Sequence, residues 1–255
     1  MIPGKVYLIG AGPGDIELLT IKAVRILGEV DVVLMDDLVN REIFQFLQPD
    51  VEVIEVGKRG GCKSTSQLSI HDLMLKYAKA GYNVARVKGG DPYVFGRGGE
   101  EMQFLAEHGI SAEVVNGVTA GVAVPASIGI PVTHRDCARS VTFVTGHVCN
   151  ERPVNWRGIA AAGGTIVIYM GIAHLSEIVE ELLAAGIADD MPVAVVQHGT
   201  LPHQRSITST LAKLPEAVKA HQIGSPAIVV VGEVVDLTNT TIPVAEVSKI
   251  LEEQL

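Results

Sequence analysis

This chain of 255 residues contains few aromatic residues and few cysteines. Aromatic side chains make up only 4% of it, and its three cysteines, Cys62, Cys137 and Cys149, form no C-x-x-C pair. Such few and scattered thiols predict no disulfide framework, and they are typical of a cytoplasmic protein. The formal net charge is −9, so the chain lacks the basic excess that draws proteins to nucleic acid.

Long apolar stretches are also missing. The uncharged stretch of residues 116–133 contains three glycines and two prolines, which is not the composition of a membrane-spanning helix. The first residues show no cleavable signal pattern. We therefore expect a soluble, cytoplasmic protein that binds neither membranes nor nucleic acid.

Metal-ligand patterns are absent from the sequence as well. His198 and His203 are five residues apart with Pro202 between them, and no carboxylate is spaced to complete a site with them. We expect no metal ion.

Hydrophobic residues make up 47% of the chain, in short apolar runs that alternate with amphipathic segments. The short runs are typical of buried strands, and apolar residues at helical spacing are typical of covering helices. In the first half the predicted strands are Val6–Ile9, Val30–Met35, Val51–Val56, Asn83–Val87 and Ala112–Val115. The predicted helices there are Leu18–Leu27, Glu42–Leu47, Gln67–Ala80 and Glu100–His108.

A second alternation begins near Val141, after the polar and basic stretch 131–140. Its predicted strands are Val141–Thr145, Thr165–Tyr169, Pro192–Val196, Ser206–Thr210 and Ala227–Val231, and its predicted helices are Leu175–Ala185 and Leu211–Ala220. Such a succession of strands and helices is typical of α/β domains with mostly parallel sheets. We predict two of them, residues 1–136 and 137–255, with a mixed sheet in the second.

Polar or glycine-rich loops follow the first four predicted strands, with the sequences GAGPGD, MDDLV, GKRGG and KGGDP. In α/β proteins ligands bind at the carboxyl ends of strands or between domains. These loops therefore predict a ligand site.

The first of these loops is similar to a dinucleotide-binding turn but departs from it. The pattern G-x-G-x-x-G requires a third glycine where this chain has Asp15, and Pro13 removes one N–H from the phosphate cradle. A carboxylate at that place repels a pyrophosphate, so the turn favours a ligand without phosphate. A tight turn in which Asp15 caps the next helix is compatible with either interpretation.

The stretch VKGGDPYVFGRGGEE, residues 87–101, contains five glycines. Glycines let backbone groups approach a flat or polar ligand closely. Arg97 and Glu100 are three residues apart and are expected to share one face of a helix. A solvated surface loop is the competing interpretation, but ordering so flexible a loop costs much conformational entropy, which favours a binding role.

Charged groups in other loops are further candidates, although charge pairs in loops are usually solvated. They are Asp36, Asp37, Lys58, Arg59, Lys63, His134, Arg135 and Arg139.

Taken in order, these segments resemble the uroporphyrinogen-III C-methyltransferases of the tetrapyrrole methylase family, which are class III S-adenosylmethionine-dependent methyltransferases. GGDP-x-x-FGRGGEE followed by GIP-x-THR is the most specific part, and Ile16 and Tyr93 are departures from the usual pattern. The resemblance implies two α/β domains with an active-site cleft between them and a homodimer. The matching elements cover nearly the whole chain and are GAGPGDIELLTIKAVRIL, DDLV, GKRGG, VKGGDPYVFGRGGEE, GVTAGVAVPASIGIPVTHRD, VTFVTGH, IYMG and QHGT.

The implied reaction uses S-adenosylmethionine, releases S-adenosylhomocysteine and methylates uroporphyrinogen III at C2 and C7, giving precorrin-2 through precorrin-1. Among the implied cofactor residues, the carboxylate of Asp91 suits the cationic sulfonium. The implied cofactor site consists of Pro13, Gly89, Gly90, Asp91, Val94, Thr119, Ala120, Met170 and Gly199.

The resemblance also implies a proton acceptor at Asp36 and a proton donor at Lys58, with Arg97 and Glu100 as rival acid–base residues. Since the substrate is a polycarboxylate and arginine binds carboxylates through two parallel hydrogen bonds, further residues are expected to bind it. These are Arg59, Arg97, Arg135 and Arg139.

Three other functions stay open at this point: methylation of a later corrin precursor, ligand binding without catalysis, and NAD-dependent oxidoreduction. FGRGGEE and GIPVTHRD argue against the first. The presence of Asp36, Lys58, Arg97 and Met170 argues against the second. The end product of the pathway, sirohaem, cobalamin or haem d1, is also open.

Overall fold

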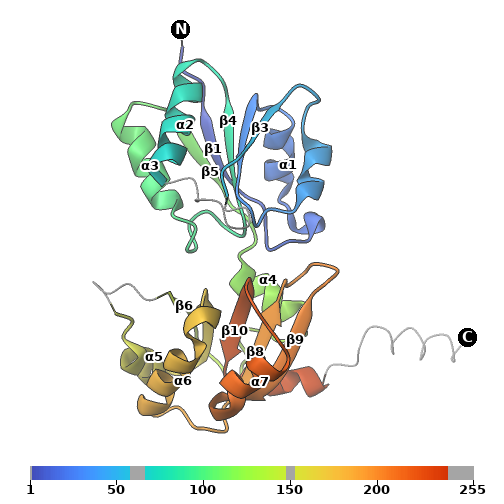
Figure 1. The fold of residues 1–255 in the computed structure, drawn as a ribbon, viewed down its shortest axis with the longest axis vertical. Coiled ribbons are helices and arrows are strands. Elements are labelled where there is room, and N and C mark those ends of the chain that lie inside the picture. Colours follow the sequence, from blue (N-terminus) through green and yellow to red (C-terminus); the bar gives the residue numbers. More distant parts are fainter. Residues whose placement is uncertain (1, 58–66, 148–152, 241–255) are drawn as a thin grey trace, which may run out of the picture. The chain divides into compact units, whose positions relative to one another are not determined.

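The computed structural model describes residues 2–57, 67–147 and 153–240. Two compact units make up the chain, Met1–Ala120 and Gly121–Leu255, and each contains a five-stranded sheet with helices (Figure 1). The α/β class predicted from the sequence is therefore confirmed. The predicted domain boundary at 136/137 lies inside the second unit.

The sheet of the first unit is entirely parallel. Its strand order is β3-β2-β4-β1-β5, and every neighbouring pair runs in the same direction. All five carboxyl ends therefore lie at one edge of the sheet, and the loops singled out above follow the strands there. The strands are β1 (Val6–Gly10), β2 (Val32–Met35), β3 (Glu52–Glu55), β4 (Val84–Lys88) and β5 (Ala112–Val115).

Helices cover both faces of this sheet (Figure 1). The helix α1 (Ile21–Leu27) packs on the face that carries Ala85 and Val87 of β4. The helices α2 (Gln67–Lys79) and α3 (Gly98–Glu107) pack on the face that carries Val84. Because side chains alternate along a strand, the next residues on the second face are Arg86 and Lys88, so this face becomes charged toward its carboxyl end.

The sheet of the second unit is mixed, with the order β6-β7-β10-β8-β9. Only β6 and β7 pair in parallel, and β10 runs antiparallel to both β7 and β8. The ends of β7 and β8 therefore lie at the same edge. The strands are β6 (Val141–Thr145), β7 (Thr165–Tyr169), β8 (Pro192–Gln197), β9 (Arg205–Thr210) and β10 (Ala227–Val231).

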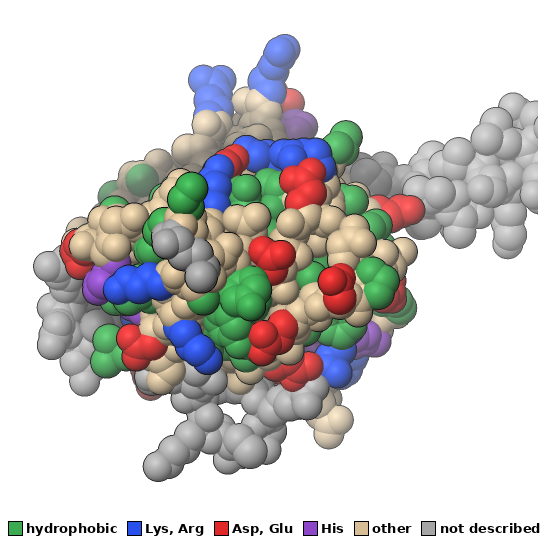
Figure 2. Space-filling view, turned by 90° about the horizontal axis from the view of Figure 1, so that it is seen from above, with side chains coloured by type: hydrophobic (Ala, Val, Ile, Leu, Met, Phe, Trp, Pro, Cys, Tyr) green, Lys and Arg blue, Asp and Glu red, His purple; other side chains and the backbone are tan. Residues whose placement is uncertain are grey.

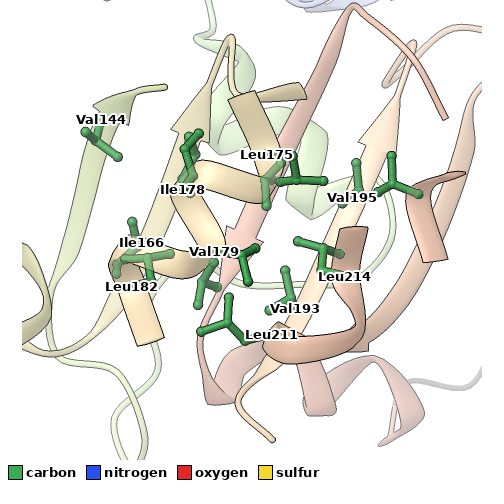
Figure 3. Close-up of a cluster of buried hydrophobic side chains, with 14 of the residues drawn as sticks. Val144, Ile166, Leu175, Ile178, Val179, Leu182, Val193, Val195, Leu211 and Leu214 are labelled. Carbon is green, nitrogen blue, oxygen red and sulfur yellow. The ribbon is translucent and has the colours of Figure 1, made fainter. Parts of the chain in front are cut away.

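The core of this unit lies between one face of the sheet and three helices, α5 (Trp156–Ala162), α6 (Leu175–Ala184) and α7 (Leu214–Ala220). Figure 3 shows Ile166, Val193 and Val195 from the strands packed against aliphatic residues of α6 and α7. A further helix, α4 (Ala120–Ala126), contacts Tyr169 and Gly199. Short 3-10 helices are η1 (Ile16–Leu18), η2 (Arg41–Phe46), η3 (Ile172–His174), η4 (Leu211–Lys213) and η5 (Glu233–Thr240).

Some helices differ from the prediction. The helix predicted over Leu18–Leu27 starts only at Ile21, because the hydroxyl of Thr20 accepts a hydrogen bond from the N–H of Ala23 at 3.1 Å and caps it. The helix α5 was not predicted, because it is short and alanine-rich and Trp156 is its one buried residue.

The surface seen end-on in Figure 2 carries acidic and basic side chains interspersed with hydrophobic ones. On the coloured part of this face, the negative charge of the chain is therefore not gathered into one broad field. No helix in the described part of the chain combines the length and the apolar character that a membrane crossing requires.

Candidate active site

Three glycines bring the loops after β1, β4 and β5 into contact. A Cβ placed on Gly117 would lie 2.2 Å from the carbonyl oxygen of Gly90, and one on Gly10 would lie 2.5 Å from the nitrogen of Gly117. Distances this short exclude any side chain. The N–H of Gly90 also donates to the carbonyl of Gly12 at 2.7 Å, and the N–H of Gly12 donates to the carbonyl of Gly90 at 3.2 Å. The loops that the sequence suggested as a ligand site are thus joined through bare backbone.

The backbone of Gly89 and Gly90 is half-buried at this junction. Gly90 adopts φ +67°, which glycine reaches without strain, and a Cβ there would meet only the nitrogen of Ala120, at 3.8 Å. A Cβ on Gly89 would touch the exposed Leu38 at 3.4 Å. Space beside Gly90 is therefore available for ligand atoms, with the N-terminal end of α4 next to it.

Asp15 caps the short helix η1. Its Oδ1 accepts a hydrogen bond from the N–H of Glu17 at 2.9 Å. The capping interpretation is therefore confirmed, and a carboxylate stands where a dinucleotide-binding loop presents N–H groups to phosphate. This edge of the sheet suits a ligand without phosphate.

Asp91 ties the loop after β4 to the loop after β5. Its Oδ1 accepts from the N–H of Tyr93 at 2.8 Å, and its Oδ2 accepts from Asn116 Nδ2 and from the N–H of Gly117, both at 3.2 Å. The sequence suggested that this carboxylate meets a cationic ligand. Its side chain is buried and both oxygens bind the protein itself, so the carboxylate holds the two loops together.

Arg97 and Glu100 form a bidentate ion pair, but Arg97 is the N-cap residue of α3 and lies outside the helix on which the two were expected to share a face. Arg97 Nε lies 3.0 Å from Glu100 Oε1, and Arg97 Nη2 lies 2.6 Å from Glu100 Oε2. The hydrogen bond from Arg97 lowers the pKa of Glu100. Both side chains are more than half exposed, and Arg97 itself has a left-handed backbone at φ 58°. The pair stands at the surface where α3 begins.

Asp36 belongs to a cluster of four charged side chains at the end of β2 and β4. Arg86 Nη2 lies 2.5 Å from Asp36 Oδ1, and Lys88 Nζ lies 3.8 Å from Asp36 Oδ2. Behind them Glu101 Oε1 accepts from Arg86 Nε at 3.2 Å and from Lys88 Nζ at 3.1 Å. Arg86, Lys88 and Glu101 were not among the residues predicted from the sequence. Two cations at alternate positions of an otherwise apolar strand, VARVK, are the signal that could have revealed them.

Other predicted site residues lie in loops of the two units or outside the part of the chain that the structure describes. Lys58 and Arg59, the predicted proton donor and a predicted substrate ligand, are outside the described residues. Pro13, Val94 and Thr119 are half-buried in the loops of the first unit. In the second unit, Arg135 and Arg139 are both exposed, and Arg139 Nε donates to the carbonyl of Arg135 at 3.4 Å.

The ends of β7 and β8 carry unusual backbone conformations. Met170, His198 and Thr200 all have positive φ, at 55°, 50° and 69°. Non-glycine residues in this conformation are strained and concentrate at functional sites. Gly199 packs so closely on α4 that a Cβ would lie 2.5 Å from Val124. Met170 and Gly199, both predicted cofactor residues, therefore lie at one edge of the second sheet.

The two histidines considered in the sequence analysis do come together, with the rings of His198 and His203 4.5 Å apart. Burial, and then the neighbouring His203, lowers the pKa of His198. Among the residues that the structure describes, no group of three or more potential ligands is arranged to hold a metal ion.

Comparison with known proteins defines the class to which this fold and site belong. A family model described as Tetrapyrrole (Corrin/Porphyrin) Methylases matches residues 5–215. The chain belongs to this family.

Individual relatives cover most of the chain. It is 51% identical over 231 residues to the uroporphyrinogen-III C-methyltransferase of Pseudomonas aeruginosa, covering 91% of this chain and 94% of the relative. The siroheme synthase of Thiobacillus denitrificans is 48% identical over 92% of this chain, but the chain spans only 49% of that relative's length.

Solved structures share the fold. The uroporphyrin-III C-methyl transferase from Thermus thermophilus complexed with S-adenyl homocysteine has a TM-score of 0.80 and 40% sequence identity, covering 92% of this chain and all of the other. A cobalamin biosynthetic enzyme, cobalt precorrin-4 methyltransferase, has a TM-score of 0.81 and 29% identity, covering 91% and 95%.

Proposed function

We propose that this protein is an S-adenosylmethionine-dependent C-methyltransferase that methylates uroporphyrinogen III at C2 and C7, giving precorrin-2 through precorrin-1. The main support is the 51% identity, over nearly the full chain, to an enzyme of that name. Two features of the structure agree with this reaction: the loops that meet at Gly10, Gly90 and Gly117, and the partly exposed carboxylate of Asp36.

S-adenosylmethionine fits the carboxyl edge of the first sheet. The cofactor has no phosphate, and the capping carboxylate of Asp15 makes this edge unsuitable for one. The open space beside Gly90 lets half-buried backbone groups meet a polar ligand. When bound, the cofactor supplies an electrophilic methyl group and leaves as S-adenosylhomocysteine. The residues that we propose hold it are Pro13, Gly89, Gly90, Asp91, Val94, Thr119, Ala120, Met170 and Gly199.

The chain's own residues then have two tasks. They orient the electron-rich pyrrole carbon of the acceptor toward the methyl group, and good orientation alone can lower a barrier by about 7–11 kcal/mol in the best cases. They also remove the proton that the macrocycle must lose after methylation. Asp36 is our proposed acceptor, since it is partly open to solvent and is held by Arg86. Lys58 remains the proposed donor, and Glu100 and Arg97 remain alternatives.

Arg97→Ala is expected to weaken acceptor binding much more than cofactor binding. Arg97 is exposed and presents a guanidinium beside the donor loop, where it can bind a substrate carboxylate. Loss of one charged hydrogen-bonding group predicts about a tenfold or larger rise in KM for uroporphyrinogen III. The dissociation constant of S-adenosylhomocysteine, measured by calorimetry, should change less than about twofold.

Arg25→Ala is the matched control, because Arg25 also forms an exposed pair with a nearby glutamate, Glu29, at 3.1 Å. It should leave both constants as they are. The opposite pattern for Arg97→Ala, weaker cofactor binding with an unchanged KM for the acceptor, would show that Arg97 serves the donor instead.

Met170→Lys is expected to weaken cofactor binding. Met170 is 51% exposed at the end of β7, and a cation placed beside a sulfonium repels it. We expect about a tenfold higher dissociation constant for S-adenosylmethionine by calorimetry. Met170→Leu keeps an apolar side chain in the same backbone conformation and serves as the control. Equal affinities of the two variants would remove Met170 from the cofactor site.

Turnover by the pure protein tests the proposed function. Uroporphyrinogen III and S-adenosylmethionine are incubated with it, and the oxidised product is analysed by mass spectrometry and fluorescence. A red-fluorescent product with two added methyl groups supports the proposal. Cofactor binding with no methyl transfer above a control without enzyme would favour a non-catalytic protein.

Methylation of a later corrin precursor is the second candidate, favoured by the TM-score of 0.81 to cobalt precorrin-4 methyltransferase. Lower identity, 29% against 51%, ranks it behind. No reaction with uroporphyrinogen III, together with methylation of a later precursor, would reverse this order.

We further propose that the protein is a cytoplasmic homodimer that serves sirohaem or cobalamin synthesis. This assembly and location rest on the family resemblance and on the composition of the chain. Sedimentation equilibrium should give twice the chain mass of 27.0 kDa, and a single chain mass at micromolar concentration would contradict it.

A further inference from the structure

We propose that Glu101 and Lys88 are positioning residues for Asp36: the buried Glu101 carboxylate anchors Lys88 and Arg86, and these two cations hold the Asp36 carboxylate at the edge of the sheet. This inference rests on the proposed function, in which Asp36 accepts the proton. Neither Glu101 nor Lys88 touches the substrate in this account.

Exposure distinguishes Asp36 from the other three members of the cluster. The side chains of Arg86, Lys88 and Glu101 are 2%, 5% and 0% exposed, whereas that of Asp36 is 30% exposed. Within the cluster, Asp36 alone reaches solvent to any extent. A reacting group can meet it, while the other three can act only through it.

Charge balance explains why the buried members depend on each other. Two cations and two carboxylates share the cluster, and a buried charge without a partner is strongly destabilising. Glu101 Oε1 accepts three hydrogen bonds, from Arg86, Lys88 and Gln67 Nε2 at 3.1–3.2 Å. Within the described part of the chain, Glu101 Oε2 has no partner. Glu101 is thus the common anchor of both cations.

Three secondary-structure elements meet at this anchor. Lys88 and Arg86 come from β4, Glu101 comes from α3 and Gln67 from α2. The N–H of Asp36 donates to the carbonyl of Val87 at 3.1 Å, so its backbone is fixed to the same strand. Lys88 directly precedes Gly89 and Gly90. The proposed base, Asp36, is therefore bonded to Val87, which is followed directly by Lys88 and by the glycines of the proposed cofactor loop.

The protonation of Lys88 provides a measurable signal. Burial lowers the pKa of Lys88, and the Arg86 guanidinium lowers it further, while the carboxylates of Glu101 and Asp36 raise it. Glu100 on α3 also interacts electrostatically with the Lys88 ammonium group. Nε2 of His71, on α2, lies 3.2 Å from Nε2 of Gln67. A lysine whose pKa is lowered loses its charge at a lower pH than an ordinary lysine does. Removing the Glu101 charge must move that loss to lower pH.

Glu101→Gln is the principal variant because it keeps the shape of the side chain and an acceptor oxygen while it removes the charge. We expect kcat to fall about tenfold or more and the alkaline limb of kcat/KM to move to lower pH by about one unit. NMR of the lysine side-chain nitrogens should show the same shift for Lys88. The dissociation constant of S-adenosylhomocysteine should stay within about twofold of wild type.

Glu107→Gln is the matched control, since Glu107 lies on the same helix, is exposed and accepts a hydrogen bond from Gln103 at 3.2 Å. It should leave the rate, the pH profile and the Lys88 signal unchanged. If Glu101→Gln leaves the Lys88 signal and the alkaline limb where they are in wild type, the proposal is wrong.

The double variant Lys88→Met/Glu101→Gln separates positioning from stability. It removes one cation and one anion together, so the remaining pair of Arg86 and Asp36 stays balanced. We expect thermal stability to recover from any loss in Glu101→Gln, while kcat stays low. Recovery of kcat together with stability would show that the pair only supports the fold, and would overturn the proposal.

Failure of this proposal and failure of the proposed function give different results. If the wild-type protein methylates uroporphyrinogen III and the Glu101→Gln variant is equally active, the positioning proposal is wrong and the proposed function stands. A wild-type protein without turnover removes the function. In that case an unshifted Lys88 signal in Glu101→Gln also overturns the anchor, and a shifted one supports it.

Discussion

Asp36→Asn is expected to lower kcat for methylation of uroporphyrinogen III by about a hundredfold or more. The amide keeps the size of the side chain but cannot accept the proton that the methylated macrocycle loses. Arg86 and Lys88 would also face a neutral group at 2.5 and 3.8 Å in place of a carboxylate. Steady-state assays with both substrates measure the effect, which should fall on kcat and not on cofactor affinity.

Asp72→Asn makes the same chemical change at an exposed position of α2 and should leave kcat unaltered. Calorimetry with S-adenosylhomocysteine shows whether the Asp36→Asn protein still binds the cofactor. A variant with full cofactor binding and a kcat within about threefold of wild type would rule out Asp36 as the proton acceptor, and attention would then turn to Glu100.

Gly117→Ala is expected to have the largest effect on the fold, lowering the free energy of unfolding by about 3 kcal/mol or more. Its Cβ would lie 2.2 Å from the carbonyl oxygen of Gly90 and 2.7 Å from Gly10. All of these are backbone atoms of strand ends and loops, so they cannot move aside as a flexible side chain would. Denaturant unfolding measures the loss, and cofactor binding should weaken with it.

Gly99→Ala is the control within the same unit. A Cβ on Gly99 meets nothing within 4 Å, and the residue lies in α3, where alanine is favoured over glycine. It should be neutral or slightly stabilising. If Gly117→Ala were as stable as Gly99→Ala, the close approach of the three loops would not exist in solution.

The sequence indicated the strands well, because most of them are short apolar runs between polar loops. The strands β5 and β7 begin and end at the predicted residues, and the glycine-rich loops do meet at one edge, as parallel strands require. Helix limits were harder to predict, because they depend on local caps. Thr20 shortened α1, and the predicted helix Glu42–Leu47 is the 3-10 helix η2.

The charged cluster around Asp36 could not be predicted from the sequence alone. Arg86 and Lys88 occupy a strand whose other residues are apolar, and only the packing of α3 shows that Glu101 lies behind them. Asp91 is the opposite case, because the sequence pointed to the residue but not to its hydrogen bonds. The motif drew attention to its carboxylate, but the hydrogen bonds to Tyr93, Asn116 and Gly117 arise from a loop conformation that no sequence pattern specifies.

Binding of the methyl donor at the carboxyl edge of the first sheet is the claim on which the account depends most. A crystal structure of the protein with S-adenosylhomocysteine tests it most directly. We predict that the adenosyl part contacts the backbone of Gly89 and Gly90 and the residues Thr119 and Ala120. An adenosyl group bound away from these residues, with Gly89 and Gly90 left in open solvent, would contradict it.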